Sequence, residues 1–189
     1  LEARERNGVD QYAAYLSSSP DTSAFAAPAA IDWRNISGQN FVTLVKNQGG
    51  CGSCVAFGAV AAVESKVKIL RGASYAIDLS EAHLFYCIAR AQGRTCGGST
   101  GGWWPEPSEI GFRDIGVCDE ACYPYTSGDQ NCSNRCADWQ NRVIRTTGYT
   151  KIGGVQTTRD WVSANGPAQA CFTVYSDFYH YYSSGVYRK

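Results

Sequence analysis

One seven-residue segment limits what this chain can fold into more than any other. Residues 48–54 read Gln-Gly-Gly-Cys-Gly-Ser-Cys, and an apolar stretch, 55–60, follows directly. We expect Cys54 in the first turn of a helix, where unpaired backbone N–H groups and the helix dipole favour a nucleophilic thiolate. Gln48 carries an amide that can donate to a developing oxyanion, and the glycines let backbone approach a ligand closely. The segment therefore predicts a cysteine nucleophile at a helix start.

The residues that follow predict a long helix. Ser53 is a favourable N-cap and Gly72 a stop signal, which indicates a helix over 54–71. A small residue, Gly58 or Ala59, is expected to let this helix pack closely against a second domain. Apolar side chains recur every three or four positions and predict one buried stripe, made by Phe57, Val60, Val63, Val67 and Leu70.

The cysteine content indicates the compartment. Nine cysteines in 189 residues are typical of an oxidising environment, so we expect a secreted, periplasmic or lysosome-like protein. With Cys54 set aside, eight remain, and their spacing alone does not determine the pairing. A zinc site is the competing interpretation of the cluster at 118–136. The spacing disfavours zinc, since these cysteines are four positions apart and the commonest knuckle is Cys-x2-Cys. We expect no metal and no cofactor.

The charge balance and the apolar stretches exclude two classes of partner. Seventeen basic and seventeen acidic side chains cancel, and no basic stripe indicates nucleic acid. The longest apolar stretches, 55–63 and 24–31, are too short to cross a bilayer. The glycine-rich loop at 96–102 lacks the strand, helix and Lys-Ser/Thr of a nucleotide-binding loop. We therefore expect neither a nucleic-acid nor a membrane partner.

The pattern changes along the chain. Residues 1–29 are charged and then rich in Ser, Ala and Pro, which predicts a short helix and a linker. Ser80 predicts a second helix ending near Arg90. From about residue 142 the pattern indicates β structure, with 143–149 partly alternating and 168–175 a candidate buried strand. Between them, 157–160 form a capping box for a helix that ends at 165–167.

The residues around Cys54 resemble the papain and cathepsin family of cysteine proteases. The family signature is Cys-Gly-[Ser/Ala]-Cys-[Trp/Tyr], and residues 51–55 agree at four of five positions, with Val55 as the departure. Similar segments run along the chain at 30–34, 42–48, 79–81, 123–125, 166–167, 176–178 and 184–187, and those after 165 are most similar to cathepsin B. The resemblance therefore covers the chain from residue 30 to residue 187.

This resemblance implies an α+β, papain-like two-domain fold. A helical left domain, 30–140, would carry the nucleophile. Residues 141–189 would be the first part of a β-barrel-like right domain, which is expected to be incomplete. Residues 1–29 would be an N-terminal extension or a propeptide remnant.

The resemblance also implies residue roles. Cys54 would attack the scissile carbonyl and form an acyl-enzyme, with its own N–H and the Gln48 amide holding the oxyanion. A disulfide between Cys51 and Cys96 would brace the nucleophile loop, and Cys87 would pair within 118–136. Either Trp103 or Trp104 would wall a pocket, and the predicted substrate-binding residues are Gly52, Ser53, Gly101, Gly102 and Trp103.

The family pairs its cysteine with a His and an Asn about 130–150 residues downstream. This chain has two histidines, His83 and His180, and neither lies in the Gly-Gly-His context of the family base. We interpret the chain as a fragment that is inactive alone. The alternatives are a peptide-binding pseudoprotease, a recruited His180 base, a disulfide-rich interaction module with Cys54 bonded, or a peptide ligase. Expected partners are a peptide or protein substrate, a propeptide or protein inhibitor, and a second chain.

Overall fold

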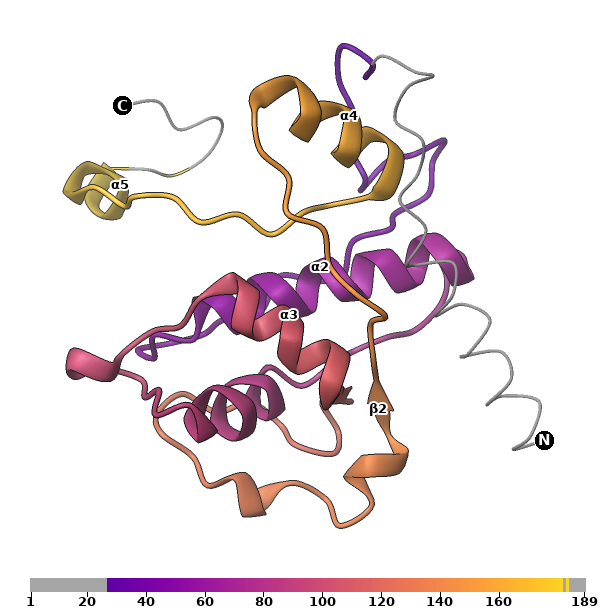
Figure 1. Cartoon of the computed structure of the whole chain (residues 1–189). Helices are drawn as coiled ribbons and strands as arrows, with labels where there is room; N and C mark the ends of the chain where they lie inside the picture. The colour runs from indigo at the N-terminus through magenta and orange to yellow at the C-terminus, as the bar shows by residue number, and fades with distance from the viewer. Residues whose placement is uncertain (1–26, 182, 184–189) are drawn as a thin grey trace.

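The computed structural model describes residues 27–181 and residue 183. Its central element is α2 (Cys54–Arg71), and these bounds confirm the helix predicted from the sequence (Figure 1). Gly72 follows with φ 104°, a left-handed conformation that glycine adopts without strain, and its N–H closes the last turn on Lys68. Ser53 occupies the N-cap position, but its hydroxyl bonds to Tyr125 instead of to a helix N–H.

The buried face of α2 is lined mainly by small residues. The predicted stripe is confirmed at its centre, where the side chains are buried. At its two ends the prediction of burial is wrong, because the side chains there are only partly buried. The alanines let neighbouring elements approach the helix axis closely, so the tightest packing is centred beside the predicted stripe. The buried apolar residues of α2 are Val55, Ala56, Ala59, Val60 and Val63, its buried polar residues are Glu64 and Ser65, and the stripe residues that are only partly buried are Phe57, Val67 and Leu70.

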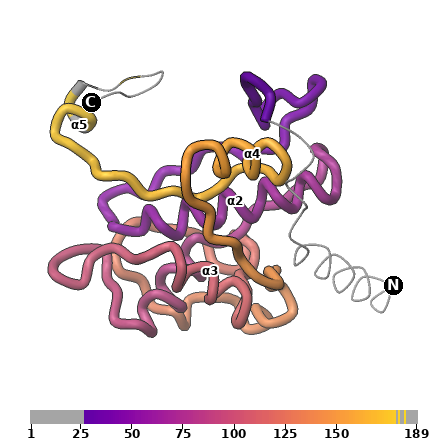
Figure 2. Tube along the Cα trace, turned by 45° about the horizontal axis from the view of Figure 1, so that its top comes forward, coloured from indigo at the N-terminus to yellow at the C-terminus, as the bar shows by residue number. Residues whose placement is uncertain are grey.

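A second helical segment, residues 81–91, and α3 (Pro105–Asp114) complete the helical domain with α2 (Figures 1 and 2). The predicted cap is confirmed, since the Ser80 hydroxyl accepts the His83 N–H at 2.9 Å. The central part of this segment, η1 (His83–Ala89), is a π-helix. A Cβ placed on Gly111 would lie 2.8 Å from the Ile88 side chain, so only glycine allows α3 this close to η1.

Three disulfides hold the irregular segments between the helices. They join Cys51 to Cys96, Cys87 to Cys132, and Cys122 to Cys136. The pairings implied by the family resemblance for Cys51 and for Cys87 are confirmed. The part of the chain that the structure describes holds no metal-binding group of three or more His, Cys, Asp or Glu side chains. Short 3-10 turns line these segments: η2 (Gly98–Thr100), η3 (Cys132–Asn134) and η4 (Trp139–Asn141).

The β content is much smaller than the sequence predicts. Within the described part of the chain, two short strands, β1 (Val117–Cys118) and β2 (Val143–Ile144), pair antiparallel with Val117 opposite Ile144. The strand expected at 168–175 is wrong, because this stretch is extended coil whose backbone groups find no partner strand among the described residues. Residues 145–153 likewise form no backbone–backbone hydrogen bond with any described residue.

The later part of the chain lies against α2. Helix α4 (Val155–Asn165) ends at the predicted residue but begins before the expected capping box, with Gly154 as its N-cap and no side chain capping it. It lies on the side of α2 away from α3, where Lys66 donates to the Asn165 carbonyl at 3.1 Å (Figure 1). A short α5 (Ser176–Tyr181) follows. No described helix has the length and apolarity to span a bilayer. The helix predicted within 1–29, most of the linker after it, and the family-like segment 184–187 lie outside the described residues.

Candidate active site

Cys54 is the first residue of α2, and its thiol is free and exposed. The sulfur therefore belongs to the terminal residue of an 18-residue helix, at the end where unpaired N–H groups and the positive end of the helix dipole lie. The next residue is held from the later part of the chain, because the Gln169 amide donates to the Val55 carbonyl at 2.7 Å. Gly58 lies beneath Gln169, where an added Cβ would come within 3.2 Å of its amide nitrogen. This contact agrees with the expectation that a small residue lets α2 pack closely against the later part of the chain.

Gln48 is oriented by two hydrogen bonds. Its side-chain nitrogen donates to the Cys51 carbonyl at 2.9 Å, and its backbone carbonyl accepts the Tyr125 hydroxyl at 2.9 Å. A primary amide has two N–H groups, so one of them stays uncommitted among the described residues. Gln48 as an oxyanion donor stays a prediction, and this geometry leaves a donor for that role.

Gly52 and Ser53 are fixed by contacts within the protein. The Gly52 N–H donates to the Cys96 carbonyl at 2.8 Å, and an added Cβ would lie 3.0 Å from that oxygen and 3.1 Å from the Gly102 nitrogen. The close approach of the glycine-rich loop therefore favours glycine here, because a Cβ would fit only if that loop shifted. Ser53 is fully buried, with its hydroxyl 2.7 Å from that of Tyr125. The Ser53 side chain therefore packs inward, away from any bound ligand.

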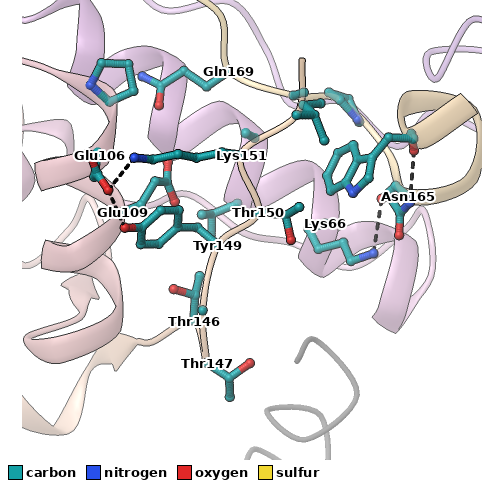
Figure 3. A pocket seen from close by; sticks show the side chains of 18 of the residues that line it. Lys66, Glu106, Glu109, Thr146, Thr147, Tyr149, Thr150, Lys151, Asn165 and Gln169 are labelled. Carbon is teal, nitrogen blue, oxygen red and sulfur yellow. Dashed lines mark hydrogen bonds and ion pairs between the residues drawn. The ribbon is translucent and has the colours of Figure 1, made fainter. Parts of the chain in front are cut away.

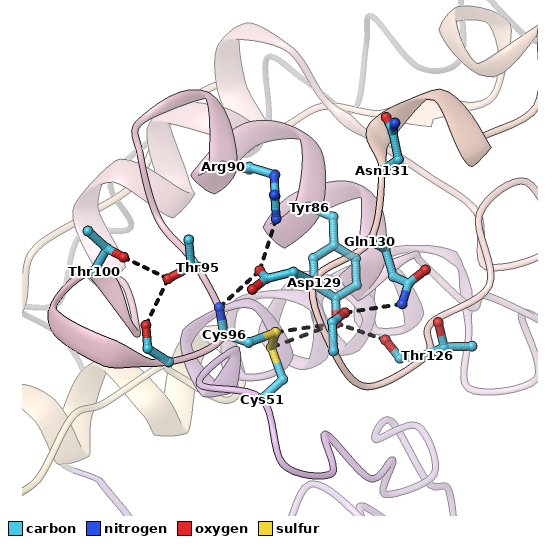
Figure 4. Close-up of polar contacts among 12 residues, drawn as sticks. Cys51, Tyr86, Arg90, Thr95, Cys96, Thr100, Thr126, Asp129, Gln130 and Asn131 are labelled. Carbon is cyan, nitrogen blue, oxygen red and sulfur yellow. Dashed lines mark hydrogen bonds and ion pairs between the residues drawn. A yellow bond between two sulfur atoms is a disulfide. The ribbon is translucent and has the colours of Figure 1, made fainter.

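The Cys51–Cys96 disulfide joins the nucleophile loop to the glycine-rich loop (Figure 4). The Asp129 carboxylate accepts the Cys96 N–H at 3.0 Å and the Arg90 guanidinium at 2.9 Å. The Tyr86 hydroxyl lies beside the disulfide sulfurs and donates to the Thr126 carbonyl at 2.8 Å. The loop that carries Cys54 is therefore anchored to both the second helix and the 126–129 turn.

The two tryptophans of the glycine-rich loop have different environments. Trp103 is 6% exposed, and its indole N–H donates to Gln92 at 3.0 Å, so it is a core residue. Trp104 is 62% exposed and lines a cavity. Gly102 adopts φ 78°, and among the described residues neither its N–H nor its C=O is hydrogen-bonded. Gly101, in contrast, donates its N–H to the Gly98 carbonyl at 3.2 Å.

A cavity of about 1060 Å³ lies between α2, α3, the 144–152 segment and the end of α4 (Figure 3). Burial raises the pKa of Glu109 to about 7 and lowers the pKa of Lys66. The Glu106 carboxylate pairs with the Lys151 ammonium at 2.7 Å and accepts the Tyr149 hydroxyl at 2.8 Å. Cys54 does not line this cavity. Sequence reasoning missed it, because its walls come from four segments with no shared motif.

Residues 27–189 match the family model described as papain family cysteine protease. The chain belongs to the papain family. It is 33% identical over 170 residues to cathepsin K of Gallus gallus, covering 89% of this chain and 47% of that protein.

Solved structures of this family share the fold. Digestive procathepsin L2 from the larval midgut of Tenebrio molitor superposes with a TM-score of 0.63 at 33% identity, covering 76% of this chain and 43% of that one. A Carica candamarcensis cysteine protease in complex with E-64 gives a TM-score of 0.50 at 36% identity, covering 64% and 51%. The chain thus has the papain-like α+β fold, with the β-barrel domain present only in part among the described residues. It spans about half the length of the curated relatives it matches.

The two histidines of this papain-family chain occupy different settings. His83 is buried, its Nδ1 accepts the Cys118 N–H at 3.2 Å, and burial lowers its pKa to about 4. It also packs against Trp139, with ring centroids 5.0 Å apart. His83 is therefore a neutral core residue. His180 is exposed on α5.

Three cysteines remain outside disulfides among the described residues: Cys54, Cys118 and Cys171. Cys118 is buried, which raises the pKa of its thiol to about 11 and makes it a poor nucleophile. Cys171 is exposed on the extended 168–175 stretch, with no helix start beside it. Cys54 alone in the described part of the chain combines a free thiol, exposure and the N-terminus of a long helix.

Proposed function

We propose that Cys54 is the nucleophile of a peptidase that cleaves peptide bonds through an acyl-enzyme. One observation carries this: the family-motif cysteine is free and exposed at the first turn of α2, within a loop braced by the Cys51–Cys96 disulfide. The thiolate attacks the carbonyl carbon, and the oxyanion accepts hydrogen bonds from the Cys54 N–H and the second Gln48 N–H. The amine then leaves and a thioester forms, which water hydrolyses.

This chemistry needs a base that accepts the thiol proton and returns it to the leaving amine. His83 is buried in the core, so it does not serve. We propose that the imidazole is supplied from outside these 189 residues, either by the rest of the protein or by a second chain. Segments 145–153 and 167–174 support this proposal, because their backbone groups have no backbone partner among the described residues and can pair with further strands.

The substrate would be a peptide or protein that lies along the glycine-rich loop. The free N–H and C=O of Gly102 support backbone recognition there, since an extended peptide can bond to them like an added strand. Trp104, exposed beside them, suits the pocket wall better than Trp103. Procathepsin relatives make a propeptide an expected partner, and three disulfides fit a secreted or lysosome-like compartment.

The test uses peptide hydrolysis by the protein that carries these residues. Cys54→Ser is expected to lower the hydrolysis rate by several orders of magnitude. The matched control is Cys171→Ser, which removes the other exposed free thiol and should leave the rate unchanged. E-64 should modify Cys54 and spare Cys171. Hydrolysis that survives Cys54→Ser would contradict the proposal.

The second candidate function is a peptide-binding pseudoprotease. The burial of His83 favours it, because this core histidine then provides no base for Cys54. In that case a peptide would bind along the glycine-rich loop and stay intact. Mass spectrometry of a bound peptide separates the two: cleavage products support the peptidase, and recovery of the whole peptide supports the pseudoprotease. The interaction module with a bonded Cys54 has no support, since this thiol is free.

A further inference from the structure

The hydroxyl of Tyr125 contacts both ends of the loop that precedes Cys54. It donates to the backbone carbonyl of Gln48 at 2.9 Å and shares a 2.7 Å hydrogen bond with the Ser53 hydroxyl. Since the phenol proton goes to Gln48, the Ser53 hydroxyl is the donor in the second bond. One side chain, 77 and 72 residues distant in sequence, thus links the candidate oxyanion donor to the residue before the nucleophile.

The ring of Tyr125 packs against two aromatic neighbours. It meets the edge of Phe57, one turn into α2, with ring centroids 4.8 Å apart. It stacks on Tyr86 at 5.6 Å with an interplanar angle of 16°. Its backbone N–H donates to the Glu120 carboxylate at 2.6 Å. The hydroxyl therefore has a fixed location relative to the start of α2.

The position of this hydroxyl bears on catalysis because an oxyanion pocket works only when its donors are correctly spaced. A displacement of about 1 Å at a catalytic group can cost about 100-fold in rate. Gln48 lies in coil and has no helix or strand to hold it. We propose that Tyr125 is a positioning residue, which sets the separation between the Gln48 amide and the Cys54 N–H. This inference rests on the proposed function of Cys54.

Two reagents separate positioning of the oxyanion donors from general exposure of the thiol. With p-nitrophenyl acetate, the thiolate adds to the carbonyl carbon, charge develops on the carbonyl oxygen, and p-nitrophenolate leaves as the thioester forms. With iodoacetamide, the thiolate displaces iodide at a saturated carbon, and no oxyanion forms. At about pH 9 free thiols ionise without a base, so both reactions proceed on this chain. All proteins carry Cys171→Ser, which removes the other exposed free thiol.

The decisive variant is Tyr125→Phe, and its matched control is Tyr123→Phe. Tyr123 is buried where Tyr125 is partly buried, and its hydroxyl donates to the Asn131 carbonyl at 2.8 Å, away from the nucleophile loop. We expect Tyr125→Phe to slow acylation about tenfold and to change alkylation by less than about twofold. Tyr123→Phe should change neither rate by more than about twofold. Ser53→Ala, which removes one of the two contacts, should slow acylation in the same selective way.

The outcomes are distinguishable. Equal effects of Tyr125→Phe and Tyr123→Phe, or a parallel loss of acylation and alkylation, would overturn the inference and leave the proposed function standing. If Tyr125→Phe does not fold by circular dichroism, Ser53→Ala decides, and an unchanged ratio of the two rates overturns the inference. If Cys54 of the parent protein reacts with neither reagent, the proposed function fails and the inference fails with it.

Discussion

Two of the disulfides form a matched pair for a test of what braces the nucleophile. Cys51–Cys96 and Cys87–Cys132 each join residues 45 positions apart. Loop-closure entropy for such a loop is about 13 cal/mol/K, or about 4 kcal/mol at 25 °C. Replacing either pair by alanines should therefore lower the free energy of unfolding by about the same 4 kcal/mol. The third bridge, Cys122–Cys136, spans 14 positions and should contribute about 3 kcal/mol.

The two variants should differ in the reactivity of Cys54. Of these two disulfides, only Cys51–Cys96 connects the loop before Cys54 to the glycine-rich loop. A hydrogen bond from Gly52 to the Cys96 carbonyl, at 2.8 Å, joins the same two loops. Its loss should slow acylation of Cys54 by p-nitrophenyl acetate about tenfold or more, since the oxyanion donors lose their anchor. Loss of Cys87–Cys132 should leave acylation of the folded protein within about twofold.

The measurements are urea unfolding followed by tryptophan fluorescence and the acylation burst under folding conditions. A difference of more than about 2 kcal/mol between the two variants would refute the loop-entropy argument, because the loops are equal in length. Equal acylation rates in the two variants would refute the idea that Cys51–Cys96 is the brace of the site.

Three further predictions concern the core and the loops. His83 has a folded pKa of about 4, below its ordinary value, so the unfolded chain binds the proton first and stability falls as pH drops from about 6.5 to 4. Urea titrations across this range should show the slope, and His83→Gln should flatten it; an unchanged slope would contradict the assignment. Trp103→Ala should cost about 3–5 kcal/mol of unfolding free energy, whereas Trp104→Ala, at an exposed site, should cost about 0.5 or less, and equal costs would count against the packing described. Gly52→Ala should destabilise by about 1–3 kcal/mol in the same assay, because the added methyl lies 3.0 Å from the Cys96 carbonyl oxygen, and a neutral result would show that the loop can shift.

Local signals predicted the helical domain well. The bounds of α2 follow from a motif at one end and Gly72 at the other, and the Ser80 cap follows from side-chain chemistry within three residues. The predicted strand at 168–175 failed for a different reason. A strand depends on hydrogen bonds to a distant partner, and no partner for it lies among the described residues.

In the candidate site, too, some features were predictable from the sequence and others were not. The motif identified Cys54 and Gln48, and the family resemblance implied the Cys51–Cys96 bridge that the structure contains. Neither the motif nor the resemblance indicated that the Ser53 hydroxyl turns inward to Tyr125, or that Trp103 packs inside while Trp104 lines the cavity. Adjacent aromatic residues give one-dimensional pattern analysis no means to tell which of them faces the core.

The sequence by itself determined the chemical groups of this chain: a cysteine at a helix start, an amide six residues before it, and enough cysteines to cross-link the loops by disulfides. Those properties reside in short contiguous stretches, where residue type and spacing suffice. Only the tertiary structure decided which groups hold the neighbours of that cysteine in place, because the hydroxyl of Tyr125 bonds Ser53 from 72 positions away and the amide of Gln169 bonds Val55 from 114 positions away. Contacts at that separation arise from the packing of whole elements, which no local pattern encodes.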